Sequence, residues 1–204
     1  MEQATKAGFS NATLALIPAG IILNVALGTL ISILKLPIYL DAVGTIVVTL
    51  LAGWRAGMVV GVGSFALMSV LVNPVYIYFV GTQAVIALYV YVVAERLQLL
   101  RNTFTTILAG IGLGVVAAVV SAPVIVAVFG GVAGSGRDLI TAVLMNSGTQ
   151  VLKAVALSGA ASEPIDKTIQ LVLACLLVRG APKAVLTRFP SSAVSKNGFL
   201  SGGR

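Results

Sequence analysis

Long apolar runs dominate this chain and restrict what it can fold into. The hydrocarbon core of a bilayer is crossed by a helix of about 20 apolar residues, and runs of this kind recur along the sequence. The stretch 36–72 divides at Gly53, Arg55 and Gly57 into two shorter runs, because glycines mark a tight turn there. We therefore predict an all-α integral membrane protein, a bundle of six transmembrane helices. The predicted spans are 12–34, 38–52, 55–72, 79–94, 104–128 and 164–180.

The composition agrees with lipid as the solvent and excludes several kinds of chemistry. Of the 204 residues, 58% are hydrophobic and only 9% are charged. The sequence contains no His and a single Cys, so it offers no imidazole base, zinc cluster or disulfide framework. It also has no phosphate-binding P-loop motif. We expect no enzymatic activity, no cofactor and no metal. Any energy input must come from outside this chain.

The basic residues predict an orientation. With the N-terminus in the cytoplasm, nine of the 13 Lys and Arg residues fall inside and four outside, as the positive-inside rule requires. Because they lie singly between apolar runs, they form no continuous basic face, and we expect no nucleic-acid partner. We predict a multi-pass protein of a prokaryotic plasma membrane with both ends cytoplasmic. Its parts would be an N-terminal segment 1–11, one transmembrane domain 12–190 and a disordered tail 191–204.

Residues 139–157 have a helical pattern of their own between the fifth and sixth spans. Asn146, Gln150 and Lys153 recur at i, i+4 and i+7, which places them on one face of a helix. We expect this additional helix either to lie at the membrane interface or to line a pocket.

Polar residues in the outer half of the predicted bundle indicate a binding pocket. Polar groups within spans are costly and should face the interior, a cavity or water, where they can converge on a small organic molecule. Alternatives remain open: Asp41 can cap the second span, and Tyr76 and Tyr78 can be interfacial anchors. Asn24 needs a partner within the bundle or a ligand. The predicted substrate-binding residues are Asn24, Asp41, Thr45, Asn73, Tyr76, Tyr78, Gln83, Asn146, Gln150 and Lys153.

Acidic and basic residues around Pro164 have a structural interpretation. Glu163, Asp166 and Lys167 resemble the first turn of the sixth helix, with Pro near its first position and acids beside it. We therefore do not expect them in the pocket.

Small residues mark the faces where helices can approach closely. The ladders Gly53, Gly57, Gly61 and Gly110, Gly114, Ala118, Ala122 are expected to pack inside the bundle. The pair Ala15 and Ala19 in the first span is instead expected to form a surface on which the helices of another protein dock.

Together these features resemble a known family. Six spans, the pair Ala15 and Ala19, the segment "LPIYLDAVGTI" and the closing "SEPIDKTIQLVLACLLVRGAPKAVLTRFP" are similar to the substrate-binding S-component of energy-coupling factor transporters, over about residues 12–190. The resemblance implies capture of a vitamin or related micronutrient from outside. It also implies a transmembrane coupling subunit that meets Ala15 and Ala19, two cytoplasmic ATPases, and a pocket beneath the loop "KLPIYLD". The lack of His argues against the nickel and cobalt members.

Two other functions fit the sequence. A self-sufficient secondary carrier would need ion sites at mid-membrane and paired broken helices, for which Asn24 is the one central polar residue. A membrane sensor or scaffold would have to act through a separate chain.

Overall fold

All regular secondary structure in residues 9–189, the part of the chain that the computed structural model describes, is helical. The predicted tail 191–204 and most of the predicted segment 1–11 lie outside these residues. In chain order the helices are α1 (Asn11–Leu34), α2 (Val43–Ala52), α3 (Trp54–Leu71), η1 (Pro74–Phe79), α4 (Val80–Tyr91), η2 (Val92–Arg96), η3 (Leu99–Arg101), α5 (Thr103–Phe129), α6 (Asp138–Asn146), α7 (Val151–Gly180) and α8 (Lys183–Leu186).

Four helical segments in the described residues are long and apolar enough to cross a bilayer. They are α1, α3, α5 and the continuous segment Pro74–Arg96, while α2 is apolar but has only 10 residues. Large apolar side chains on these helices are exposed on the outside of the bundle. The fold is therefore that of an all-α protein suited to a membrane, and four of the predicted spans have the required length and composition.

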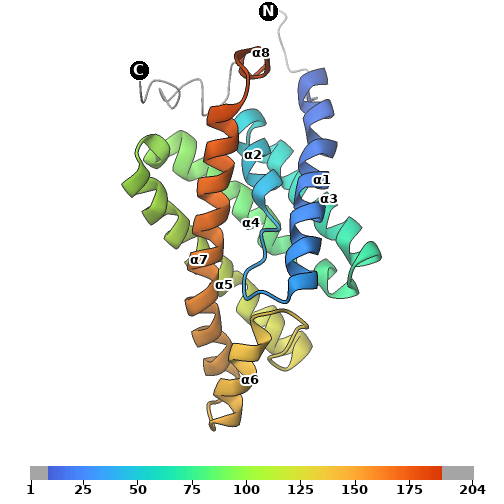
Figure 1. Cartoon of the computed structure of the whole chain (residues 1–204), viewed down its shortest axis with the longest axis vertical. Coiled ribbons are helices and arrows are strands. Elements are labelled where there is room, and N and C mark those ends of the chain that lie inside the picture. Colours follow the sequence, from blue (N-terminus) through green and yellow to red (C-terminus); the bar gives the residue numbers. More distant parts are fainter. Residues whose placement is uncertain (1–8, 190–204) are drawn as a thin grey trace, which may run out of the picture.

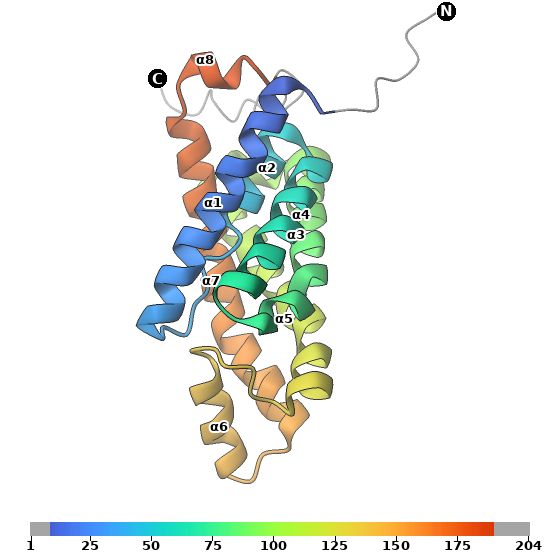
Figure 2. The ribbon, with the colours of Figure 1, turned by 90° about the vertical axis from the view of Figure 1, so that its right-hand side faces the viewer.

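The short helix α2 occupies the centre of the bundle. It packs against α1, α3, α4 and α7, and nearly all of its side chains are buried. Figure 1 shows it between α1 and α7, with α8 and the first turn of α1 at one end of the molecule and α6 at the other. Figure 2 shows α1 running obliquely across the bundle and α6 extending beyond the far end of α1.

The second predicted span is shorter than the sequence indicated. Residues 38–42 form an irregular loop rather than the first turn of a helix, and Leu40 has φ +50°. The backbone N–H groups of Tyr39 and Leu40 donate to the carboxylate of Asp166, and that of Ala42 donates to Gln170. Hydrogen bonds to distant side chains therefore replace those of a helical turn.

The sixth predicted span is longer than the sequence indicated, and the separate helix 139–157 is wrong as predicted. Helix α6 ends at Asn146, the chain turns at Gly148 with φ +87°, and α7 then runs unbroken through Pro164. Glycine at positive φ is a strong stop signal for a helix. Proline inside a helix costs about 3 kcal/mol, which the long contact between α7 and α5 offsets.

That contact depends on glycine. A Cβ atom on Gly114 would lie 2.3 Å from the Cα atom of Pro164, and one on Gly110 would lie 2.6 Å from the Cα atom of Thr168. Gly57 and Gly61 are similarly close to Thr49 and Gln83. The predicted internal packing of both glycine ladders is thus confirmed at these four positions.

Candidate functional site

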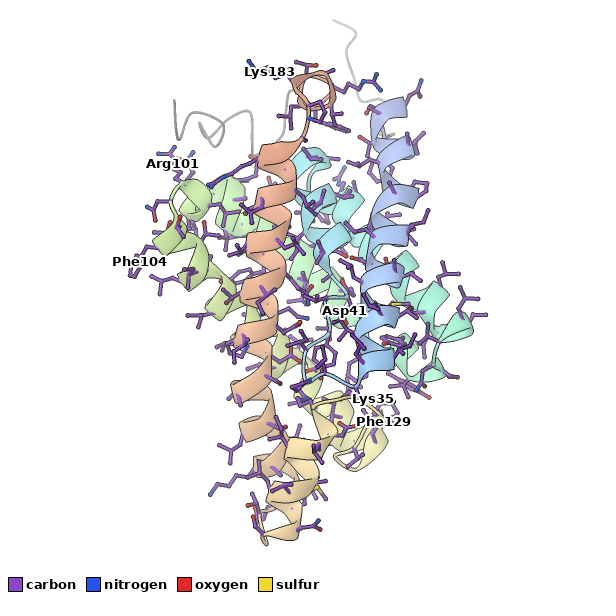
Figure 3. All side chains as sticks on the ribbon, viewed as in Figure 1. Lys35, Asp41, Arg101, Phe104, Phe129 and Lys183 are labelled. Carbon is purple, nitrogen blue, oxygen red and sulfur yellow. The ribbon has the colours of Figure 1, made fainter. Side chains whose placement is uncertain are left out.

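A cavity of about 110 Å³ lies in the half of the bundle that is nearer to α6. Its walls come from the last turns of α1, the loop 35–42, α3, η1, α4, α5, the loop before α6 and the middle of α7. Lys35 and Leu36 in its lining are exposed, so the cavity reaches the surface at this end. Figure 3 shows Asp41 between α1 and α7, with Lys35 closer to the α6 end.

Lys167 is the centre of a buried group of charges at the cavity wall. Its Nζ atom lies 2.6 Å from Asp166 Oδ2 and 3.3 Å from Asp41 Oδ1. It also lies 3.8 Å from Glu163 Oε2, one helical turn away on α7. The side chain is only 3% exposed, so three carboxylates stabilise an ammonium that burial alone would disfavour.

A second buried cation completes what we call the charge cluster: Asp41, Arg137, Glu163, Asp166 and Lys167. Arg137 precedes α6, is 2% exposed and donates from its Nη1 atom to Glu163 Oε1 at 3.1 Å. The cluster thereby joins three separate parts of the chain, which are the loop 35–42, the loop before α6 and α7.

The loop 35–42 is held over the cavity by α7. Asp166 Oδ1 accepts from the backbone N–H groups of Tyr39 and Leu40 at 2.8 and 3.1 Å, and Gln170 Oε1 accepts from that of Ala42 at 2.8 Å. Gly136 lies directly against Leu36, where a Cβ atom would be 2.0 Å from the Leu36 carbonyl oxygen. Two loops and one helix therefore close this end of the cavity.

Aromatic side chains form part of the cavity wall. Phe65 and Tyr76 meet edge to face with ring centroids 5.3 Å apart, and the Lys167 ammonium lies 5.3 Å from the centre of the Tyr39 ring. All four residues line the cavity, as does Phe79. The site thus combines an aromatic wall with buried charges, as small-molecule pockets commonly do.

Four of the predicted site residues lie together in this lining: Asp41, Asn73, Tyr76 and Gln83. Asp41 does not cap α2, which has no side-chain cap, and it contacts Lys167 instead. Asn73 has a local role as well, because its side chain accepts from the backbone N–H of Val75 and caps η1.

Asn24 and Thr45 lie outside the cavity lining, in a buried polar network between helices. Asn24 donates to Thr45 Oγ1 at 2.9 Å and to Ser64 Oγ at 3.0 Å, and accepts from the backbone N–H of Gly44 at 2.6 Å. Thr45 donates onward to Gln83 at 3.1 Å. Asn24 therefore finds its partners within the bundle, where it links α1, α2 and α3.

The remaining predicted residues do not reach the cavity, and for them the prediction needs correction. Asn146, Gln150 and Lys153 are exposed and do not share one helix, because the turn at Gly148 leaves Asn146 at the end of α6, Gln150 just before α7 and Lys153 on α7. Tyr78 is 52% exposed and packs edge to face against Phe129. For Asn146, Gln150 and Lys153 the physical cause is the turn at Gly148, which periodicity alone did not reveal.

Sequence reasoning missed Arg137, Glu163, Asp166, Lys167 and Gln170, which carry most of the charge and hydrogen bonding at the site. The sequence did contain a signal for four of these residues. Glu163 with Lys167, and Asp166 with Gln170, are spaced i, i+4 and so share a helix face, and ionisable residues beside apolar runs commonly face a bundle interior. Pro164 concealed this signal because it indicated the beginning of a helix.

In the described residues, no group of three or more His, Cys, Asp or Glu side chains is arranged to hold a metal ion. The cavity lining in the described residues thus contains both buried charged groups and aromatic rings, and the Lys167 ammonium lies beside the Tyr39 ring. No family model matches this chain, and neither a curated protein nor a solved structure matches it.

Proposed function

We propose that this chain is the substrate-binding component of an ATP-driven uptake system in a prokaryotic plasma membrane, of the energy-coupling factor kind. It would capture a vitamin-like small molecule from outside and pass it on through a transmembrane coupling subunit and two cytoplasmic ATPases. The observation that carries the proposal is the cavity beneath the loop 35–42, at the end of the bundle away from α8.

The proposed topology has six spans with both ends in the cytoplasm. Helices α2 and α7 join the four longer apolar segments, and the 30 residues of α7 extend about 45 Å, more than a bilayer core requires. Its charges do not contradict this role, since Glu163, Asp166 and Lys167 are buried against one another rather than exposed to lipid.

The surface proposed for the coupling subunit lies on α1. Ala15 and Ala19 are exposed, unlike the glycines of α3 and α5, which pack inside the bundle. Small exposed side chains one turn apart let another helix approach closely. This surface is several turns from the cavity residues of α1, so docking and ligand binding can be changed separately.

The proposal predicts that the purified protein retains a small organic molecule. Mass spectrometry of the compounds released when the detergent-solubilised protein is denatured is expected to find one compound at about one per chain. Adding it back should raise the unfolding temperature. If no compound is retained and no added metabolite raises that temperature, the proposed function is wrong.

A second prediction concerns partner docking. Ala15→Trp and Ala19→Trp are expected to remove at least about nine-tenths of the P-loop ATPase that copurifies from membranes of the native host, because a bulky ring prevents close helix contact. Binding of the retained compound should be unchanged. Val119→Trp, at an exposed position of α5, is the matched control and should leave copurification intact.

The docking prediction also separates the alternatives. Uptake of the identified compound by vesicles that contain this chain and no ATPase would favour a self-sufficient carrier. Copurification that survives both tryptophan substitutions would place the docking surface elsewhere.

A further inference from the structure

With every group ionised, the charge cluster would carry one more negative charge than positive. It contains three carboxylates, those of Asp41, Glu163 and Asp166, against the two cations of Arg137 and Lys167. All five residues are at least nine-tenths buried, so water screens them little. Lys35 also lines the cavity, but it is exposed at the rim, where water solvates it. A buried uncompensated charge is costly, and a bound cation would remove that cost.

Two atoms of the cluster lack hydrogen-bond partners. Glu163 Oε2 has only the Lys167 ammonium nearby, at 3.8 Å, beyond hydrogen-bond distance, and Arg137 Nε has no acceptor. Both residues line the cavity. Buried polar groups are rarely left unpaired, and Glu163 Oε2 belongs to a residue of the cavity lining, so we regard it as the acceptor open to a ligand.

The size and walls of the cavity restrict the rest of the ligand. Its volume of about 110 Å³ is somewhat less than the volume of about 150 Å³ of an apolar cavity that holds a benzene molecule, so it takes at most one small ring. The rest of a ligand must extend through the opening at Lys35 and Leu36. Tyr39, Phe65 and Tyr76 are among the residues that line it. A flat ring packs well against such walls, and a cation beside aromatic rings is further stabilised.

We propose that the ligand is a small organic monocation whose charged N–H group, on a flat ring, donates to Glu163 Oε2. In the empty cavity a proton or water at the rim compensates the excess negative charge. The bound ligand displaces that proton or water. This inference rests on the proposed function, because it assumes that the cavity is a binding site.

Three compounds of nearly identical shape test the charge preference directly. Benzamidine is a cation with N–H donors, benzamide is neutral and benzoate is an anion. In calorimetric titrations of the purified, ligand-free chain, benzamidine is expected to bind at least about tenfold more tightly than benzamide, the scale of one charge-assisted hydrogen bond. Benzoate should bind more weakly still. Equal affinities, or a preference for benzoate, would overturn the inference.

A substitution tests the atom that we assign. Glu163→Gln is expected to weaken benzamidine binding by about tenfold while benzamide binding stays within about twofold, because the glutamine keeps the shape and loses the charge. Glu95→Gln, in η2 outside the cavity lining, is the matched control and should change neither. If Glu163→Gln keeps the full preference for benzamidine, Glu163 is not the group that recognises the charge. If that variant does not fold, the three titrations of the unaltered chain decide the matter.

The natural ligand distinguishes failure of this inference from failure of the proposed function. A retained compound that is anionic or uncharged at pH 7 would overturn the inference and leave the binding function in place. If no compound is retained and benzamidine does not bind, both are wrong.

Discussion

Lys167→Met is expected to lower the free energy of unfolding by about 3–5 kcal/mol. The substitution keeps a long side chain but removes the ammonium that lies between Asp41, Glu163 and Asp166. Breaking a buried ion pair leaves uncompensated charge in a medium that solvates it poorly, which is why the expected loss is large. The loop 35–42 should also loosen, since Asp166 both contacts Lys167 and accepts from the backbone of that loop.

The stability change can be measured by unfolding titrations in mixed detergent micelles. Lys153→Met is the matched control, because Lys153 is on the same helix, is exposed and contributes nothing to the cluster, so its effect should stay within about 0.5 kcal/mol. Adding Asp166→Asn to Lys167→Met should recover part of the lost stability by removing the carboxylate that was closest to the lost ammonium. A Lys167→Met protein as stable as the original chain would show that the cluster does not contribute to folding.

Gly114→Val is expected to separate α5 from α7 and to cost about 3 kcal/mol of stability, the upper end of the usual range for overpacking. Even a single Cβ atom there would lie 2.3 Å from the Pro164 Cα atom and 2.5 Å from the Glu163 carbonyl oxygen. These are backbone atoms, which cannot move aside as a side-chain end can, so the whole helix must shift. Because α7 carries Glu163 and Lys167, ligand affinity should fall together with stability.

Gly81→Val provides the comparison for this prediction. Gly81 is also helical, in α4, but a Cβ atom there meets nothing within 4 Å, so the change should be near neutral. If Gly114→Val proves as harmless as Gly81→Val, the two helices can separate without cost, and the close contact is not what keeps α7 continuous through Pro164.

Several residues of the site could be predicted from the sequence. Asp41, Asn73, Tyr76 and Gln83 were predicted because polar groups near apolar runs need a cavity or an interior partner, and all four line the cavity. Arg137 was not predicted, because a single Arg in a Gly-rich loop resembles an ordinary exposed residue. Glu163 and Lys167 were assigned to the start of a helix, because proline is common in the first turn of a helix. That preference is local and does not show that α7 already begins at Val151.

The sequence by itself determined the class of fold and most helix boundaries. Apolar length and glycine or proline punctuation are local properties, so α1, α3 and α5 begin and end within a residue or two of the expected positions. Only the tertiary structure decided which charges meet. Asp41 contacts Lys167 across 126 positions of the chain, and Arg137 contacts Glu163 across 26. The partner of a buried charge depends on how distant helices pack, and no local pattern records that choice.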